Sequence, residues 1–185
     1  FDGVSLHCEP VAETYVQFAE TSANGLVVMV DPNIQPIFVS NEPLFRDHME
    51  QMFRLAYIIK ISEEDLNWFF PESETTETKI AKLQKLGPAL IIFTCSDSSV
   101  KAWKPEENPI FVDSLKVDIV DKVGAGDSFK AGFLKSLAEA GLLKKTAISV
   151  ISESDIVAAL NFGVRTAAIT VGRAGANPPS RNELD

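Results

Sequence analysis

The residues best suited to chemistry lie between Val120 and Phe129, where small residues are followed directly by a carboxylate. The small residues are Gly124, Ala125 and Gly126. Without bulky side chains, the backbone there can turn sharply and present consecutive N–H groups to an anion. Apolar residues then recur at helical spacing, which predicts a helix to about Leu143 whose positive end faces the same anion. Asp127 lies in the first turn of that helix, where a carboxylate can take the proton from a hydroxyl that attacks a phosphoryl group.

The same residues also have a purely structural interpretation. Asp and Ser are common helix-capping residues, and a glycine-rich turn often does nothing beyond turning the chain. The longer string favours chemistry, because residues 121–133 read Asp-x-Val-Gly-Ala-Gly-Asp-Ser-Phe-x-Ala-Gly-Phe. This string resembles the signature of the ribokinase-like (phosphofructokinase B type) sugar kinases. The resemblance implies that Asp127 acts as the base and that the N–H groups of Gly124, Ala125 and Gly126 hold the phosphoryl charge.

The composition predicts an ordinary globular protein. The 185 residues are 45% hydrophobic and 23% charged, which is enough apolar content for one domain with a core. A formal charge of −9 argues against nucleic acid and anionic membranes as partners. The two cysteines, Cys8 and Cys95, lie far apart and indicate reduced thiols in a cytoplasmic protein, with a single disulfide as the open alternative.

Further signals narrow the class of protein. No apolar run approaches the roughly 20 residues that span a bilayer, and no signal peptide is visible. His7 and His48 have no ligand-like neighbours, so we do not expect zinc. A dinucleotide-binding oxidoreductase is disfavoured because the string Gly-x-Gly-x-x-Gly after a strand is missing, and the P-loop string is missing too.

The alternation of buried strands and amphipathic helices predicts a three-layer α/β fold, with a mostly parallel sheet and helices on both faces. The expected helices cover residues 11–23, 42–54, 75–86 and the stretch from the glycine-rich turn to 143, with another from Ser62 and a last one from Ser152 or Ser154 to about Ala168. The expected core strands cover residues 26–30, 56–60, 89–94 and 117–120, with a short antiparallel pair at 100–103 and 109–113. We therefore expect a single ribokinase-like domain over residues 1–185. The resemblance covers only the carboxyl-terminal part of the family, and we expect the sugar-contacting strands and the lid to lie mostly in the absent part.

A second group of candidate residues follows the expected strand 56–60. Ligands of an open parallel sheet collect beyond the carboxyl ends of its strands, so Lys60 and Glu63 are expected to face the same crevice as residues 124–127. The pair resembles the family's Asn-x-x-Glu element, with lysine replacing asparagine as in many fructokinases. The resemblance implies that Glu63 holds magnesium through water and that Lys60 meets the phosphates as a point charge. The structural alternative is a solvent-exposed helix cap without a ligand.

Several positions depart from the family's patterns. The family's Thr-x-Gly-x-x-Gly wraps the nucleotide phosphates, but here Thr94 is followed by Ser96 and Ser99 at the two glycine positions. This change weakens the expectation that Thr94 and Ser96 contact the nucleotide. Residues 31–33, Asp-Pro-Asn, are common turn formers. They also resemble the family's Asp-Pro-Asn-x-Arg element near the substrate cleft, in which Gln35 replaces the arginine.

The end of the chain resembles the family's terminal Thr-Arg-x-Gly-Ala segment, beside which many relatives bind a monovalent cation. The resemblance implies that Asp121 supplies a carboxylate to a potassium ion. The backbone carbonyls would come from Val123, Thr170, Arg173 and Gly175. Lys122 stands where threonine is usual, and its positive charge would shift or suppress that ion.

These resemblances together imply an ATP- and magnesium-dependent sugar kinase, most similar to bacterial fructokinases. Fructose is favoured by the strings Asp-Pro-Asn-Ile, Lys-x-Ser-x-Glu-Asp-Leu and Ala-Gly-Ala-Asn-Pro-Pro. A 2-keto-3-deoxygluconate or ribose kinase is the alternative within the class. A non-catalytic nucleotide-binding relative is the alternative from another class, and the departures at Gln35, Lys122, Ser96 and Ser99 suggest it. A homodimer of the full-length protein is also expected, because dimers in the family form mainly through the lid.

Overall fold

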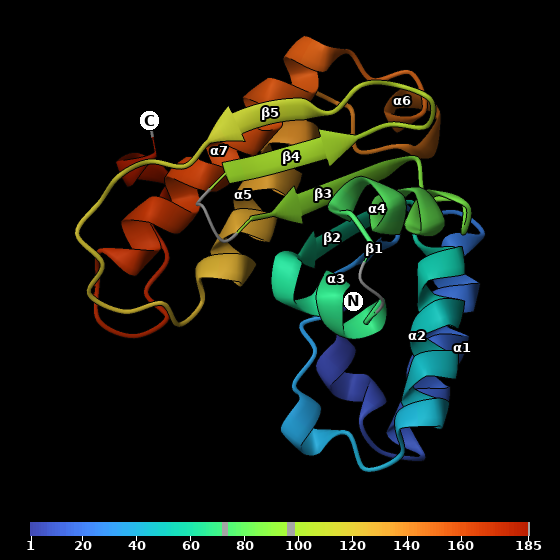
Figure 1. Cartoon of the computed structure of the whole chain (residues 1–185). Helices are drawn as coiled ribbons and strands as arrows, with labels where there is room; N and C mark the ends of the chain where they lie inside the picture. Colours follow the sequence, from blue (N-terminus) through green and yellow to red (C-terminus); the bar gives the residue numbers. More distant parts are fainter. Residues whose placement is uncertain (72–73, 96–98, 185) are drawn as a thin grey trace. The chain divides into compact units, whose positions relative to one another are not determined.

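The computed structural model describes residues 1–71, 74–95 and 99–184 (Figure 1). The chain divides into two compact units. The first comprises Phe1–Ser96 and Lys101–Pro109, and the second comprises Asp97–Val100 and Ile110–Asp185. Within the described ranges, no helix is both long and apolar enough to cross a lipid bilayer.

The helices of the first unit largely follow the sequence pattern. Helix α1 (Val11–Ala23) has the predicted bounds, and α2 (Glu42–Leu55) ends one residue later than expected. The cap of α2 is Asn41, whose side chain accepts a hydrogen bond from a backbone N–H in the first turn. The remaining helices of this unit are η1 (Gly3–Leu6), η2 (Pro36–Phe38), α3 (Glu63–Phe69) and α4 (Thr76–Gln84).

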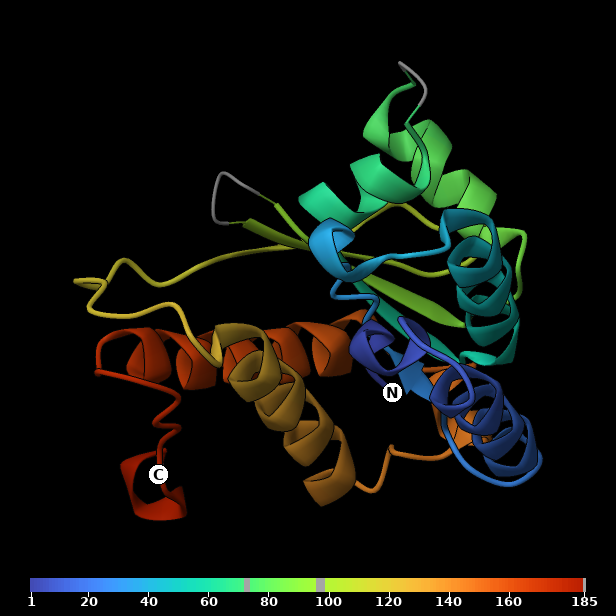
Figure 2. The ribbon, with the colours of Figure 1, turned by 90° about the horizontal axis from the view of Figure 1, so that it is seen from below.

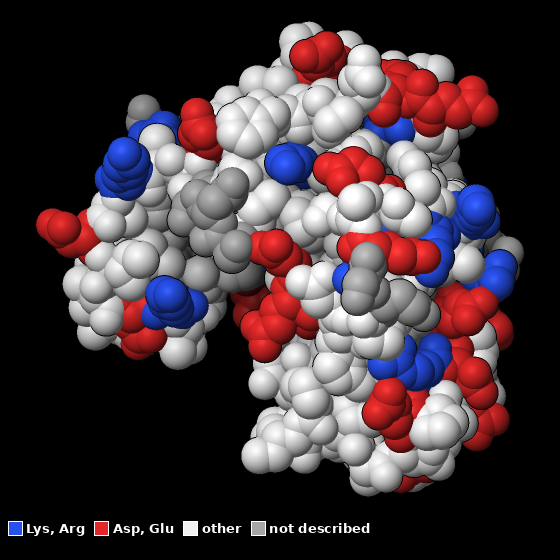
Figure 3. All heavy atoms as spheres, in the orientation of Figure 1, with Lys and Arg blue, Asp and Glu red and all other residues white. Residues whose placement is uncertain are grey.

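Helices α1 and α2 pack side by side, as both ribbon views show (Figures 1 and 2). The buried face of α2 carries Phe45, Met49, Met52 and Phe53, whose spacing places them on one side of the helix. The opposite face is charged, and its acids and bases pair along the helix as Glu42 with Arg46 and Glu50 with Arg54. Figure 3 shows acidic and basic side chains interspersed on this side of the first unit.

The strands form one sheet in the order β1-β2-β3-β4-β5. Their bounds are β1 (Met29–Val30), β2 (Ile58–Ser62), β3 (Leu90–Thr94), β4 (Ser99–Trp103) and β5 (Ile110–Asp113). Strands β1, β2 and β3 are parallel, with Val30 opposite Ile59 and Ser62 opposite Thr94. Their residues are buried except at the last position of β2 and of β3, as expected for strands covered on both faces.

The prediction of a mostly parallel sheet is wrong, because the sheet is mixed. In Figure 1 the arrow of β4 runs opposite to that of β3. Parallel neighbours need a crossover of about a dozen residues or more, whereas only residues 104–109 separate β4 from β5. This part of the sheet instead follows the short antiparallel pair that the sequence predicted.

The second unit is built around two helices, α5 (Ala125–Glu139) and α7 (Glu153–Val171), which lie against each other (Figure 2). Glycines allow the close approach, since a Cβ on Gly132 would lie 2.4 Å from Thr166 Oγ1 and one on Gly163 would lie 2.9 Å from a backbone oxygen of α5. Strand β5 packs against α7. The unit also contains α6 (Lys145–Ile148) and η3 (Arg181–Glu183).

Two predictions about this unit are wrong. Residues 117–120 do not form a core strand, and Val117, Ile119 and Val120 are 42%, 61% and 62% exposed. A β-branched run favours extended backbone, but a strand also needs a neighbour for its backbone groups, and local sequence does not specify one. Helix α5 ends at Glu139 rather than near residue 143, because Gly141 adopts a left-handed φ of 71° that stops the helix.

Candidate active site

The amino-terminal end of α5 begins with a glycine that no other residue type replaces without strain. Gly124 has a φ of 79°, which side chains other than glycine rarely adopt. A Cβ on this glycine would also lie 3.0 Å from the Cβ of Ala176, in the terminal segment of the chain. The left-handed residue turns the chain directly into the helix, and the α5 cap makes no side-chain hydrogen bond.

The first backbone N–H groups of α5 differ in their partners. The N–H of Ala125 donates to the carbonyl of Lys122 at 3.2 Å, and that of Ser128 donates to the carbonyl of Gly124 at 2.9 Å. The N–H groups of Gly126 and Asp127 have no acceptor among the residues that the structure describes. Unpaired N–H groups at the positive end of a helix attract an anion such as a phosphoryl group.

Asp127 lies at the third position of α5 and extends into solvent, with its side chain 78% exposed. Its carboxylate lies 2.9 Å from the Nζ of Lys130, one turn further along the helix. The residue at the cap position of α5 is Gly124, and among the described residues the Asp127 carboxylate pairs with Lys130 rather than with a backbone N–H of the helix start. The carboxylate therefore remains accessible beside the two unpaired N–H groups.

Asp121 connects the turn before α5 to the terminal segment through hydrogen bonds. Its two carboxylate oxygens accept hydrogen bonds from the N–H of Val123 at 3.0 Å and of Gly175 at 2.9 Å. These bonds lower the pKa of the carboxyl, the bond from Val123 most strongly. The N–H of Asp121 also donates to the carbonyl of Val171 at 3.1 Å. The structure thus brings together the two segments that the resemblance to cation-binding relatives had linked.

The cation site itself stays a prediction. Of the four carbonyls expected as ligands, that of Thr170 accepts the N–H of Arg173 at 3.1 Å and that of Gly175 accepts the N–H of Asn177 at 2.8 Å. A carbonyl oxygen has two lone pairs, so the bond to Gly175 leaves room for an ion. The carbonyl of Thr170 also accepts the N–H of Gly172. Lys122, the unusual residue in this turn, is exposed.

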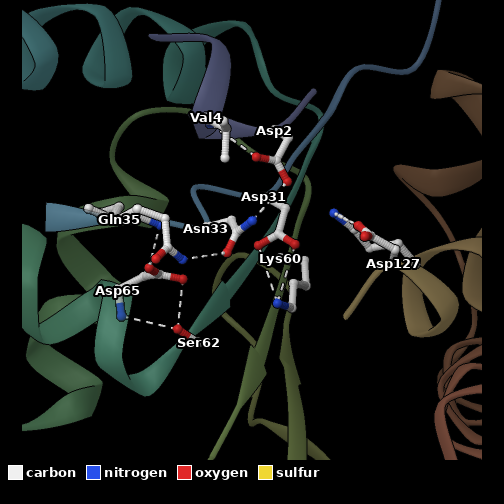
Figure 4. A network of polar contacts seen from close by, with 11 residues as sticks. Asp2, Val4, Asp31, Asn33, Gln35, Lys60, Ser62, Asp65 and Asp127 are labelled. Carbon is white, nitrogen blue, oxygen red and sulfur yellow. Dashed lines mark hydrogen bonds and ion pairs between the residues drawn. The ribbon is translucent and has the colours of Figure 1, made fainter. Parts of the chain in front are cut away.

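In the first unit, β2 extends two residues beyond the expected strand end, so Lys60 is its middle residue and not its last one. Glu63 directly follows the strand. Lys60 is 8% exposed, and its Nζ lies 3.2 and 3.3 Å from the two carboxylate oxygens of Asp31. Figure 4 shows these side chains pointing toward each other. Asp31 is 3% exposed and directly follows β1, so the ion pair joins the end of β1 to the middle of the neighbouring parallel strand β2. Sequence reasoning missed this pair, although the register of the two strands contains the signal for it.

Glu63 is the first residue of α3, directly after its cap Ser62. The hydroxyl of Ser62 accepts the N–H of Asp65 at 3.1 Å and donates to the carboxylate of Asp65 at 2.7 Å, so the helix expected from Ser62 is present with Ser62 as its cap. The other oxygen of Asp65 accepts the N–H of Ile34 at 2.8 Å, a bond that sequence reasoning missed. Burial raises the pKa of the Asp65 carboxyl, and the bonds from Ser62 and Ile34 partly offset this effect.

The nucleotide-contacting candidates are described only in part. Thr94 is the last residue of β3 and lies opposite Ser62 of β2. Ser96 lies outside the described residues, so the expected contact there has no structural description. Ser99 begins β4 and is 5% exposed.

The turn that begins at Asp31 also contains the departure at Gln35. The amide of Gln35 donates to Asn33 Oδ1 at 3.4 Å, and Asn33 adopts a positive φ of 39°. The amide of Asn33 in turn donates to Asp2 at 3.3 Å. Gln35 therefore takes part in the structure of the turn, without the positive charge that an arginine would bring.

Magnesium fits the residues present as an ion held jointly by a protein carboxylate and the phosphates of the substrate. Within the described ranges, no group of three or more His, Cys, Asp or Glu side chains is arranged to hold a metal. Magnesium in phosphate-binding enzymes is commonly held by one or two carboxylates together with the substrate's phosphates. The half-buried Glu63 at the end of β2 suits that role.

Comparisons with known proteins point to one family. The family described as "pfkB family carbohydrate kinase" matches residues 1–183. A fructokinase from Rhizobium leguminosarum bv. trifolii is 32% identical over 153 residues, which are 83% of this chain and 46% of that relative. The chain thus spans about half the length of the curated relatives it matches.

Solved structures support the fold. A fructokinase double mutant from Vibrio cholerae O395, bound to fructose, ADP and a potassium ion, aligns with a TM-score of 0.86 at 20% identity, covering 99% of this chain and 57% of that one. Aminoimidazole riboside kinase from Salmonella enterica aligns with a TM-score of 0.84 at 22% identity, covering 100% and 59%. The predicted ribokinase-like α/β fold is confirmed at this level, with the mixed sheet as its correction.

Proposed function

Because this chain belongs to the pfkB family of carbohydrate kinases, we propose that the full-length protein transfers the γ-phosphoryl group of ATP to a sugar hydroxyl. D-fructose, giving fructose 6-phosphate, is the favoured substrate. The fructokinase from Rhizobium leguminosarum bv. trifolii, at 32% identity, supports that choice. The proposal concerns the whole protein, since the chain spans about half of such relatives.

The observation that carries the proposal is the start of α5. Two unpaired N–H groups, of Gly126 and Asp127, lie beside an exposed carboxylate within one helical turn. In phosphoryl transfer, catalysis consists mainly of positioning and of stabilising charge on the transferred group. The N–H groups would bind that charge, and the carboxylate of Asp127 would accept the proton of the attacking hydroxyl.

Lys60 in β2 and Glu63, directly after that strand, would bind the polyphosphate and its magnesium. Magnesium, when bound, would neutralise part of the phosphate charge, and Glu63 would hold it through water. Lys60 would add positive charge near the phosphates, although in this structure its Nζ is paired with Asp31. A potassium ion beside Asp121 is also part of the proposal, supported by the potassium in the Vibrio cholerae fructokinase structure.

The sugar is tested by measuring ADP release from the full-length protein with Mg-ATP and a panel of sugars. The panel contains fructose, ribose, 2-keto-3-deoxygluconate and adenosine. We expect sugar-dependent turnover, highest with fructose. Faster turnover with ribose or 2-keto-3-deoxygluconate would show that fructose is not the preferred substrate, and the assignment as a sugar kinase would stand. ATP binding without turnover on any substrate would contradict the reaction class and favour the non-catalytic alternative.

A further inference from the structure

The turn that follows β1, residues 31–35, is held at both ends by side chains of one short segment, residues 60–65. At its start, Lys60 pairs with Asp31 at 3.2 Å. Near its end, Asp65 accepts the N–H of Ile34 at 2.8 Å. The three charged residues are 8%, 3% and 6% exposed, in the order Lys60, Asp31 and Asp65. Figure 4 shows the turn and the segment facing each other across these contacts.

Glu63 lies between the two anchor points of the segment. Lys60 precedes it on β2, and Asp65 follows it in the first turn of α3. Ser62 and Asp65 are bonded to each other on either side of Glu63, through both the Ser62 hydroxyl and the Asp65 N–H. The backbone of Glu63 is therefore fixed from both sides. Asp65 also connects this segment to the turn 31–35 through its bond with Ile34.

A second helix provides an internal comparison. Ser152 and Asp155 at the start of α7 repeat the local arrangement, with the hydroxyl donating at 2.6 Å and accepting the N–H of Asp155 at 3.1 Å. Among the described residues, Asp155 has no long-range hydrogen bond comparable to the one from Ile34. Capping alone therefore does not account for the contact between Asp65 and the turn.

We infer that Asp65 is a positioning residue, which holds the turn 31–35 against the start of α3 and thereby sets the placement of Glu63. This inference rests on the proposed function, in which Glu63 holds magnesium. Asp65 itself does not touch the reacting groups. The acceptor oxygen on Asp65 is the essential feature, so an asparagine that keeps Oδ1 should preserve the arrangement.

The test compares Asp65→Ala, Asp65→Asn, Glu63→Gln and the matched control Asp155→Ala in the full-length protein. Amide hydrogen exchange at Ile34, measured without nucleotide or metal, reports the contact directly. Asp65→Ala should speed that exchange about tenfold or more, because it removes a buried charge-assisted hydrogen bond. Asp65→Asn and Asp155→Ala should leave the exchange near the wild-type rate.

The magnesium concentration that gives half-maximal turnover reports the placement of Glu63. Asp65→Ala should raise this magnesium concentration several-fold, whereas Asp65→Asn should keep it near the wild-type value. Asp155→Ala should lower the stability of the protein and leave the magnesium requirement unchanged. If Asp65→Ala does not fold, Asp65→Glu takes its place, because it keeps the charge but shifts the acceptor oxygen. Asp65→Glu should also raise the magnesium concentration that gives half-maximal turnover.

An unchanged magnesium requirement in Asp65→Ala, together with a raised requirement in Glu63→Gln, would overturn the inference and leave the proposed function standing. An unchanged requirement in Glu63→Gln would overturn the magnesium role of Glu63 and this inference with it. Unchanged exchange at Ile34 in Asp65→Ala would overturn the inference whatever the protein's activity.

Discussion

Helices α5 and α7 pack against each other in the second unit, and each has an aspartate three residues after its cap. In α7 the cap is Ser152, whose hydroxyl binds both the N–H and the carboxylate of Asp155. In α5 the cap is Gly124, which has no side chain to offer, and Asp127 extends into solvent beside Lys130. The same residue at the same position thus completes a cap in one helix and remains available in the other.

The difference shows why the sequence of a helix start carries functional information. A serine cap satisfies the first N–H groups within the chain, which stabilises the helix and leaves little for a ligand. A left-handed glycine starts the helix without satisfying them. The start of α5 is therefore less stable on its own than that of α7, and it is better suited to bind an anion.

The largest combined effect on stability and activity should come from adding a methyl group at the start of α5. Gly124→Ala should destabilise the protein by about 1–2 kcal/mol from its left-handed φ, and by more because the new Cβ would lie 3.0 Å from Ala176. The displaced N–H groups should lower kcat by up to about 10²-fold. Urea unfolding and ADP release measure the two effects.

The matched control for Gly124→Ala is Gly141→Ala. Gly141 has a similar φ of 71° just beyond the other end of α5. Apart from its chain neighbours, no atom of the described residues lies within 4 Å of the position that a Cβ would take there. Gly141→Ala should therefore lower the free energy of unfolding only through the strained φ, and it should leave kcat unchanged. Equal losses of activity in the two variants would contradict a special role for the start of α5.

Removal of the α7 cap should affect stability and not catalysis. Ser152→Ala should lower the free energy of unfolding by about 1 kcal/mol, because the N–H of Asp155 loses its acceptor. Urea unfolding checks the stability, and ADP release should show an unchanged kcat. A fall in kcat as large as that of Gly124→Ala would remove the functional distinction between the two helix starts.

The smallest effect concerns how the stability of the turn before α5 depends on pH. The pKa of Asp121 is lowered from 3.8 in the folded protein, so the folded state favours its ionised form. The stabilisation is fully present above pH 3.8 and is lost as the pH falls below 3.8 through the folded pKa. Asp121→Asn should therefore flatten part of the fall in Tm as the pH drops below 3.8.

Asp118→Asn is the control for this pH series. Asp118 is an exposed residue on the same segment, and its side chain makes none of the bonds that hold the turn. Its variant should keep the wild-type dependence of Tm on pH. Identical profiles for Asp121→Asn and the wild type would show that the turn does not depend on this carboxylate.

Local signals in the sequence were sufficient for much of the fold. The bounds of α1 follow from its helical pattern and the turn residues after it, and the helix start at Ser62 follows from its capping spacing. For α7 the sequence left Ser152 and Ser154 open, and the cap is Ser152. The run 117–120 failed as a strand because strand formation depends on a partner and not only on β-branched residues.

In the candidate site, too, local features were predicted from the sequence and long-range contacts were not. The sequence located the turn before α5 and the position of Asp127 in its first turn, because both are local features. It missed the pairing of Lys60 with Asp31 and of Asp65 with Ile34, whose members lie 29 and 31 residues apart. Contacts at such distances depend on strand register and on the path of a turn, which periodicity and propensity do not determine.

The most direct test of the account compares the two equivalent aspartates. Asp127→Asn and Asp155→Asn should be measured for kcat in the full-length protein with its preferred sugar, alongside ATP binding and thermal unfolding. We expect Asp127→Asn to lower kcat by about 10²- to 10⁴-fold with stability retained. Asp155→Asn should leave kcat within a factor of about two, since a cap contributes to stability only. Undiminished turnover in Asp127→Asn would contradict the assignment of this residue as the base.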